Sequence, residues 1–294
     1  MCLWGAGRVF GGAGRRDARL GAALFQRRAG RYQGPLAHRG LCGQLGAGPR
    51  WDGDLPGTPG EILEFRFRAD TIAPENLETP AANDRRYAGA LSVGVHSQFG
   101  FGGFEADVGA DLVFVGPQTG LGDFQSWVHN ALGLGDVGAL DNQIGNTVQP
   151  TVSAEIARRF DLGGGAEFRP FAEARAGDET LVRLGGDLVV GNFGRSDLML
   201  RDVGTGQRFR AVQGTTATGV SLVLGGDVAR VFDSIYLPDG EAVTASDTRH
   251  RLRAGMHWQG ESSAAFYGVT YLSPEFDEQD EGQLVGALSL NFKF

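Results

Sequence analysis

Two polar residues, Gln125 and His129, stand four positions apart in a short segment that follows a strand-like run and a glycine-rich turn at residues 115–122. Residues with this spacing lie on the same side of a helical turn, so the amide and the imidazole would point to one place. Because imidazole titrates near neutral pH, a histidine held in this way can take part in catalysis. The pair is therefore a candidate catalytic site, although an ordinary polar contact is the more common role of such a pair.

The sequence has five histidines, and the other four are weaker candidates. His38 lies in an unusual N-terminal segment, whereas His96, His250 and His257 lie within strand-like segments. A histidine on a strand is more often a packing or ion-pairing residue than a catalytic one. We expect structural roles for these residues.

The rest of the chain alternates apolar and polar residues with a period of two, which is typical of strands with one apolar and one polar face. In residues 61–70, for example, Phe65 and Phe67 fall on one face and Arg66 and Arg68 on the other. Turn-rich stretches separate further segments of this kind. They are residues 87–98, 103–115, 147–160, 166–177, 181–191, 208–213, 218–232, 248–259, 263–272 and 283–294.

Alternation of this kind fits either a soluble β-sandwich or a membrane barrel with a polar lumen. The sequence has no run of about 18 apolar residues, so it predicts no membrane-spanning helix. The strands of a membrane barrel, however, need only about 9–11 residues. The last strand-like segment alternates to the final residue, Phe294. This ending is similar to that of bacterial outer-membrane proteins. We therefore predict an all-β fold, an antiparallel transmembrane β-barrel. A soluble β-sandwich that acts as a binding module is the third of three functional hypotheses, after the two membrane-barrel hypotheses given below.

Charge and cysteine content argue against two further classes of protein. The net charge of -8 disfavours a nucleic-acid partner, which would need a basic surface. Both cysteines, Cys2 and Cys42, fall in the first fifty residues, so the remaining body has no disulfide framework or cysteine-based zinc site.

Several blocks, in order, resemble the lipid A 3'-O-deacylase family of outer-membrane esterases. Residues 84–89 (Asp-Arg-Arg-Tyr-Ala-Gly) resemble the family's Asp-Arg-Pro-Tyr-Ala-Gly element, with Arg86 replacing the proline. Residues 115–120 resemble its Gly-Pro loop, residues 125–129 its Gln-x-x-x-His motif, and residues 267–276 and the terminal strand its closing segments. The resemblance covers roughly residues 60–294. It implies a 12-stranded barrel in the bacterial outer membrane that acts on lipid A, the membrane anchor of lipopolysaccharide.

The resemblance also implies roles for individual residues. His129 would be the general base and Gln125 would orient the site or the substrate. Arg85 is a candidate for holding a phosphate or sugar of lipid A. A calcium ion, bound by oxygen ligands, would polarise the ester carbonyl.

The first fifty residues depart from this pattern. They hold nine arginines and one acidic residue, Asp17, and show neither a signal peptide nor the family's Asn-Asp pair. A one-base shift of suitable codons for residues 25–31 can encode Ser-Asn-Asp-Ala-Leu-Gly, which contains that pair. We therefore expect residues 1–50 to be an aberrant or disordered leader, with residues 1 to about 48 translated out of frame, and residues 51–294 to form the barrel domain.

This leader has functional consequences. A barrel that lacks its first strand leaves unpaired edges in lipid, and the calcium site would lose a carboxylate. The chain as written is then expected to be inactive. A non-catalytic outer-membrane barrel, porin-like or structural, is therefore the second functional hypothesis.

Overall fold

The computed structural model describes residues 17–27, 38–47, 51–214, 217–240 and 242–293, with the backbone alone for 17–27, 38–47 and 292–293. Strands dominate the described chain, and their bounds are β1 (Asp17–Arg27), β2 (His38–Ala47), β3 (Leu63–Ile72), β4 (Ala88–Phe101), β5 (Phe104–Val115), β6 (Thr147–Ala157), β7 (Phe160–Gly163), β8 (Ala166–Ala176), β9 (Glu179–Val190), β10 (Leu198–Arg201), β11 (Arg208–Val212), β12 (Gly219–Ser234), β13 (Thr248–Gln259), β14 (Ser263–Leu272) and β15 (Gln283–Lys293). Between β5 and β6 lie the 3₁₀ helix η1 (Pro117–Thr119), the α-helix α1 (Leu121–Ala131) and the 3₁₀ helix η2 (Gly138–Asn142).

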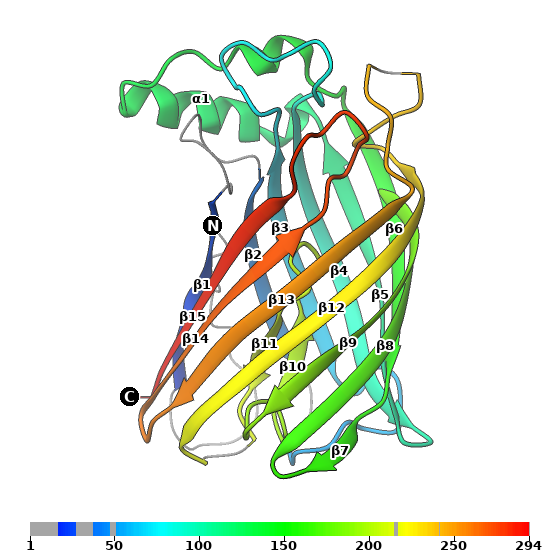
Figure 1. Cartoon of the computed structure of the whole chain (residues 1–294), viewed down its shortest axis with the longest axis vertical. Coiled ribbons are helices and arrows are strands. Elements are labelled where there is room, and N and C mark those ends of the chain that lie inside the picture. The colour runs from blue at the N-terminus through cyan, green and yellow to red at the C-terminus, as the bar shows by residue number, and fades with distance from the viewer. Residues whose placement is uncertain (1–16, 28–37, 48–50, 215–216, 241, 294) are drawn as a thin grey trace.

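One large antiparallel sheet curves into a barrel (Figure 1). Its strand order is β1-β15-β14-β13-β12-β9-β8-β6-β5-β4-β3-β2, and β7 pairs with β8 off this path, so the wall has twelve strand positions. The prediction of an antiparallel barrel is confirmed. The single strand expected over residues 147–160 is instead divided into β6 and β7, with Arg158 and Arg159 between them.

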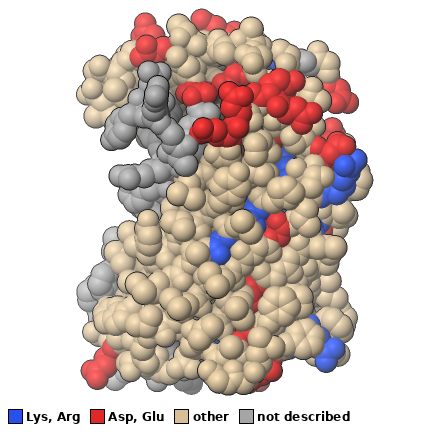
Figure 2. All heavy atoms as spheres, viewed as in Figure 1, with Lys and Arg blue, Asp and Glu red and all other residues tan. Residues whose placement is uncertain are grey.

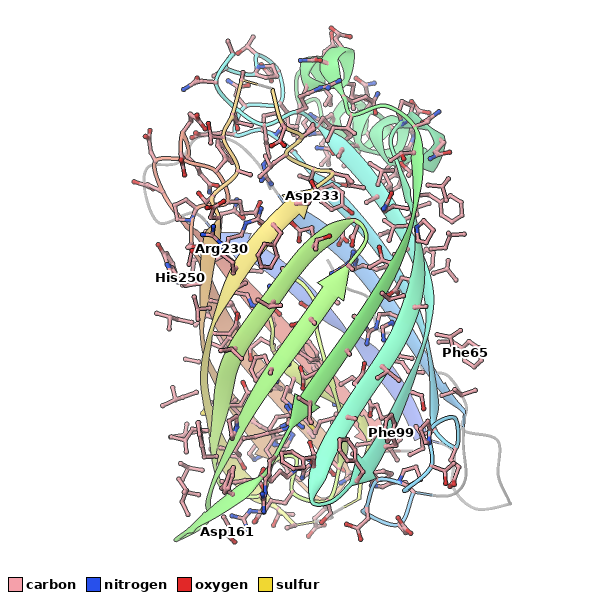
Figure 3. The ribbon with its side chains drawn as sticks, turned by 90° about the vertical axis from the view of Figure 1, so that its right-hand side faces the viewer. Phe65, Phe99, Asp161, Arg230, Asp233 and His250 are labelled. Atoms are coloured by element: carbon pink, nitrogen blue, oxygen red, sulfur yellow. The ribbon has the colours of Figure 1, made fainter. Side chains whose placement is uncertain are left out.

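The wall is apolar outside and charged inside. On β3, Phe65 and Phe67 are both 45% exposed on the outer surface, whereas Glu64 and Arg66 are buried on the lumen side, with Arg66 Nε 2.8 Å from Glu64 Oε1. Phe65 points away from the wall in Figure 3. Figure 2 shows few charged atoms along the visible wall. This distribution is that of a transmembrane barrel, where lipid covers the apolar face.

The lumen is filled by a hairpin of two short strands, β10 and β11, which pair with each other outside the main sheet. We call residues 191–214 the lumen hairpin; in Figure 1 it lies inside the lower part of the barrel. Arg201 on β10 reaches Glu155 at 2.6 Å and Asp187 at 2.8 Å, and Phe209 on β11 is buried. The strand-like segment predicted at residues 208–213 is therefore a strand, but it fills the lumen instead of forming part of the wall.

The two ends of the barrel differ. At one end, tight turns join the strands near residues 102–103, 164–165 and 260–262, and the lumen hairpin enters there. At the other end lie α1 and the long connections 73–87, 116–146, 235–247 and 273–282 (Figure 1). We call these the turn end and the α1 end. Among the described residues, no helix has the length and apolar character needed to cross a membrane.

Two strands come from the first fifty residues. β1 pairs with β15 and β2 pairs with β3, so they take the two end positions of the strand order. Their side chains, and residues 1–16, 28–37 and 48–50, lie outside what the structure describes. The proposal that this segment is an out-of-frame leader stays a prediction.

Candidate active site

The helix that carries Gln125 and His129 is held directly against the barrel wall. The amide of Gly116 donates to the carbonyl of Gly89 on β4 at 2.9 Å. A Cβ atom built on Gly89 would lie 2.6 Å from Thr119 Oγ1 and 3.0 Å from Leu121 Cβ, so η1 and the start of α1 rest on the backbone of β4. Only glycine permits this close approach.

Gln125 and His129 lie on the buried side of α1, with 7% and 5% of their surfaces exposed. The hydroxyl of Tyr87 donates to Gln125 Oε1 at 3.0 Å. Tyr87 is itself fully buried, and this burial raises the pKa of its phenol to about 12, although a hydrogen bond with Thr71 opposes the shift. The phenol therefore stays protonated near neutral pH and fixes the orientation of the Gln125 amide.

The end of α1 orients the His129 ring. His129 Nδ1 lies 3.2 Å from the carbonyl oxygen of Gly135, and because a carbonyl can only accept, Nδ1 must carry the proton. In the neutral ring, Nε2 then keeps its lone pair. The chain reverses at Gly133, whose φ of 66° favours glycine, and Leu134 N donates to the carbonyl of His129 at 2.9 Å. This turn brings Gly135 back to the imidazole.

A second segment supports the same turn. A Cβ atom on Gly135 would lie 2.1 Å from Glu78 Oε1, so the Glu78 carboxylate packs against the Gly135 backbone. The amide of Ala139 donates to the carbonyl of Leu77 at 2.9 Å, which joins the two connections. Neither Glu78 nor Tyr87 is identifiable as a site residue from the sequence alone. Tyr87 lies in the block of residues 84–89, but no pattern singles out Glu78.

The site lies on the outside of the barrel, at the α1 end. Val93 and Val95 are exposed on the outer face of β4, and Gly89 lies on the same face because an even number of residues separates it from them. Gly89 pairs with Thr71 on β3, and Thr71 lies on the same face as Phe65 and Phe67 for the same reason. The buried side of α1 therefore packs on the outer face of the wall.

Arg85 has a different environment. It is buried, forms an ion pair with Glu275, and places its guanidinium carbon 5.3 Å from the centre of the Phe276 ring. It lines two cavities, of about 180 Å³ and about 240 Å³, and neither has Gln125 or His129 among its described lining residues. The structure thus brings Gln125 and His129 together with Tyr87, and joins Arg85 to the connection between β14 and β15.

The histidines on strands have structural surroundings. His96 lies between Asp107 and Asp111, with ring nitrogens 3.3 and 3.0 Å from the two carboxylates. His257 stacks on Phe193 at 4.2 Å between ring centres, and His250 lies on the outside of the wall (Figure 3). Within the described part of the chain, no three histidine, cysteine or acidic side chains gather as a metal site would require.

Comparisons with known proteins place this fold and sequence in context. The family model "Outer membrane protein LpxR" matches residues 57–294. Among solved structures, LpxR from Salmonella typhimurium is similar with a TM-score of 0.71 and 19% identity, covering 87% of this chain and 88% of that chain. The β domain of the Bordetella autotransporter BrkA has a TM-score of 0.39 and 14% identity, covering 95% of this chain and 89% of that one. A search of curated proteins found no match.

The match to the family model extends over most of the chain, and the barrel agrees in fold with a solved structure of that family. Its wall is apolar outside, as a membrane barrel requires. The chain therefore belongs to the LpxR outer membrane protein family, and it is a β-barrel of the bacterial outer membrane.

Proposed function

We propose that this protein hydrolyses an acyl ester of lipid A, with His129 as the general base. The observation that carries the proposal is the hydrogen bond from His129 Nδ1 to the Gly135 carbonyl, which leaves Nε2 as the proton acceptor on the outer face of the wall. In transmembrane barrels the long loops are extracellular and the short turns periplasmic. The α1 end then faces outward, at the leaflet that contains lipopolysaccharide.

The proposed reaction begins when His129 Nε2 takes a proton from a water molecule. The resulting hydroxide attacks the carbonyl carbon of the ester and forms a tetrahedral intermediate. When the intermediate collapses, the bond to the sugar oxygen breaks, and the imidazolium returns its proton to that oxygen. The products are a fatty acid and a lipid A in which one more sugar hydroxyl is free. General base catalysis of this kind contributes about a hundredfold to ten-thousandfold in rate.

Gln125 and Arg85 have supporting roles in this proposal. The Gln125 amide, whose oxygen accepts from Tyr87, would orient the water or the ester through its NH₂ group. Arg85 would hold a phosphate or sugar of lipid A, and the anion would have to share or replace its ion pair with Glu275. Its buried position at the α1 end supports a contact with a headgroup that enters from outside.

Only the family resemblance suggests that the site binds calcium. Calcium prefers six to eight oxygen ligands, usually including carboxylates. Near Gln125 and His129 the described chain offers the carboxylates of Glu78 and Asp123, but no cluster of three acidic or histidine groups. The described residues alone therefore do not fit a calcium site, and no step above is assigned to a metal.

The second candidate function is a non-catalytic outer-membrane barrel. The absence of an Asn-Asp pair from the first fifty residues and the presence of Arg86 in place of the family's proline favour it. Arg86 donates from Nη2 to the carbonyl of Gln143 at 2.8 Å, so its side chain has a structural contact of its own.

Replacement of His129 by Ala tests the proposal directly. Purified full-length protein is incubated with lipid A in detergent micelles, and mass spectrometry follows the loss of one acyl chain. We expect His129→Ala to lower the turnover rate by about a hundredfold or more, because the water loses its base. Asn130→Ala is the matched control, since Asn130 is the exposed neighbour on α1, and it should keep full activity. Equal rates for both variants, or no acyl release by the parent protein, would support the non-catalytic barrel instead.

A further inference from the structure

The exposed side of α1 is apolar and its buried side is polar, which is the reverse of a helix on a water-soluble protein. The helix buries Gln125 and His129, yet Phe124 and Trp127 are 57% and 64% exposed. The two aromatic rings stack, with centres 5.9 Å apart. Leu132 and Leu134, just after the helix, are also exposed. We call these four residues the α1 apolar face.

The α1 apolar face is continuous with the surface of the barrel that meets lipid. The other side of α1 packs on the outer face of β4 through Gly89, so the apolar face is directed away from the barrel. Farther along the same outer surface, Val93 and Val95 on β4 are exposed, as is Phe67 on β3. In Figure 1, α1 lies across the end of the barrel and extends beyond the edge of the wall.

Charge supports a lipid environment as well. Between Leu121 and Leu134, Asp123 in the first turn of α1 is the one acidic residue, and neither lysine nor arginine occurs. Tryptophan and phenylalanine are the side chains that membrane-interface helices present to the boundary between headgroups and acyl chains. A water-exposed surface of four large apolar side chains would instead be unfavourable.

We propose that the α1 apolar face is embedded among the acyl chains of the outer leaflet. The helix then lies parallel to the membrane and carries Gln125 and His129 at the depth where acyl chains join their headgroups. This inference deepens the proposed function, because it identifies how an acyl chain reaches the site: along the lipid side of α1, without leaving the membrane. The insertion itself does not depend on catalysis.

Fluorescence of Trp127 tests the insertion. The protein has four tryptophans, so a variant with Trp4, Trp51 and Trp258 replaced by Phe retains Trp127 alone. This variant is folded into vesicles of phosphatidylcholine brominated near the ester end of the acyl chains. We expect the brominated lipid to quench most of the Trp127 emission, whereas aqueous acrylamide quenches little. A variant that retains only Trp258, which is exposed on the wall at β13, is the positive control for lipid contact.

Two outcomes would overturn the inference. Quenching by acrylamide without quenching by brominated lipid would place Trp127 in water. Protection from both quenchers, together with a dimer in cross-linking, would show that a second copy covers the α1 apolar face.

A separate assay distinguishes failure of this inference from failure of the proposed function. The double variant Phe124→Gln/Trp127→Gln should lose activity on lipid A in vesicles but keep its activity on a water-soluble short-chain ester, and Asn130→Gln should change neither. Equal activity of the double variant and the parent on lipid A in vesicles would contradict the proposed route. If the parent protein hydrolyses neither substrate, the proposed function fails, while the quenching result still decides whether the face is embedded.

Discussion

Gly135 determines how His129 is presented, because its carbonyl accepts from Nδ1 and its α-carbon rests against Glu78. In Gly135→Ala the new methyl group would lie 2.1 Å from Glu78 Oε1, but Glu78 is exposed and its carboxylate can rotate away. We therefore predict that Gly135→Ala leaves kcat/KM on lipid A close to the parental value. Misplacement of a catalytic group by about 1 Å can cost roughly a hundredfold in rate, so a decrease of that size would mean that the Gly135 carbonyl had moved instead.

Two further variants separate this effect from general damage to the loop. Gly145 lies in the same connection, and a Cβ atom there has no neighbour within 4 Å, so Gly145→Ala should keep parental activity. The double variant Gly135→Ala/Glu78→Ala lacks the carboxylate, so its activity should match that of Gly135→Ala. A large loss in Gly135→Ala that Glu78→Ala restores would contradict the prediction and show that the carboxylate does not rotate away.

At the scale of single residues, the sequence predicted the pairing of Gln125 and His129 because a helical turn is local and its geometry follows from spacing. It did not predict Tyr87 or Glu78. Their contacts join segments 38 residues apart, in the case of Tyr87 and Gln125, or two separate connections, in the case of Glu78 and Gly135. Such contacts depend on how the loops pack, and no periodic pattern reports this.

Among the elements, the lumen hairpin has the most consequential contacts. Arg201 on β10 forms ion pairs with Glu155 on β6 and Asp187 on β9, both of which are largely buried. Its guanidinium carbon also lies 3.8 Å from the centre of the Phe171 ring. We predict that Arg201→Ala lowers the free energy of unfolding by about 3 kcal/mol, the lower end of the range for a buried ion pair that loses one partner, because Arg169 and Arg253 still pair with the two acids.

Urea titration of the protein in lipid vesicles measures this change in the free energy of unfolding. The matched control is Arg230→Ala, since Arg230 pairs with Asp247 at 2.7 Å on the exposed surface. Exposed ion pairs contribute about 0–1 kcal/mol, so this variant should unfold almost as the parent does. Similar losses for both arginines would mean that the lumen hairpin is not held by its buried pairs.

The sequence predicted most strands of the wall because alternation with a period of two is a local property. It could not distinguish β11 from a wall strand. Arg208, Phe209 and Arg210 alternate as the wall residues do, but the outward-facing positions of a wall strand meet lipid whereas β11 is surrounded by lumen residues. Only the tertiary structure separates these two environments.

At the scale of the whole molecule, the lumen is occupied at both ends. Near the turn end, the lumen hairpin and the wall form an apolar cluster of Val189, Phe193, Met199, Phe209, Val223, Phe266 and Ala287. Toward the α1 end, a second cluster contains Ile72, Ala88, Ala90, Val113, Val115, Ile144 and Tyr236. Paired arginines and carboxylates lie between them. This interior is typical of a filled barrel and unlike a water-filled channel.

We therefore predict that the protein does not conduct ions across a planar lipid bilayer. Current is recorded at constant voltage after insertion of the purified protein, with a general porin in the same apparatus as the positive control. Stable conductance steps comparable with those of the porin would contradict the filled lumen and favour the porin-like alternative. If no conductance steps appear, the porin-like form of the second candidate function is excluded and only its structural form is left.

The lumen hairpin also constrains the order of assembly. Gln207, at its tip, contacts Val269 and Thr270 on β14, while Arg201 contacts β6 and β9 on other parts of the wall. If the wall formed first, the hairpin would have to enter the barrel from its end, past buried charges that had lost their partners. The sheet is instead expected to wrap around a preformed hairpin, which acts as a template for its curvature and gathers distant strands before the last pair meets.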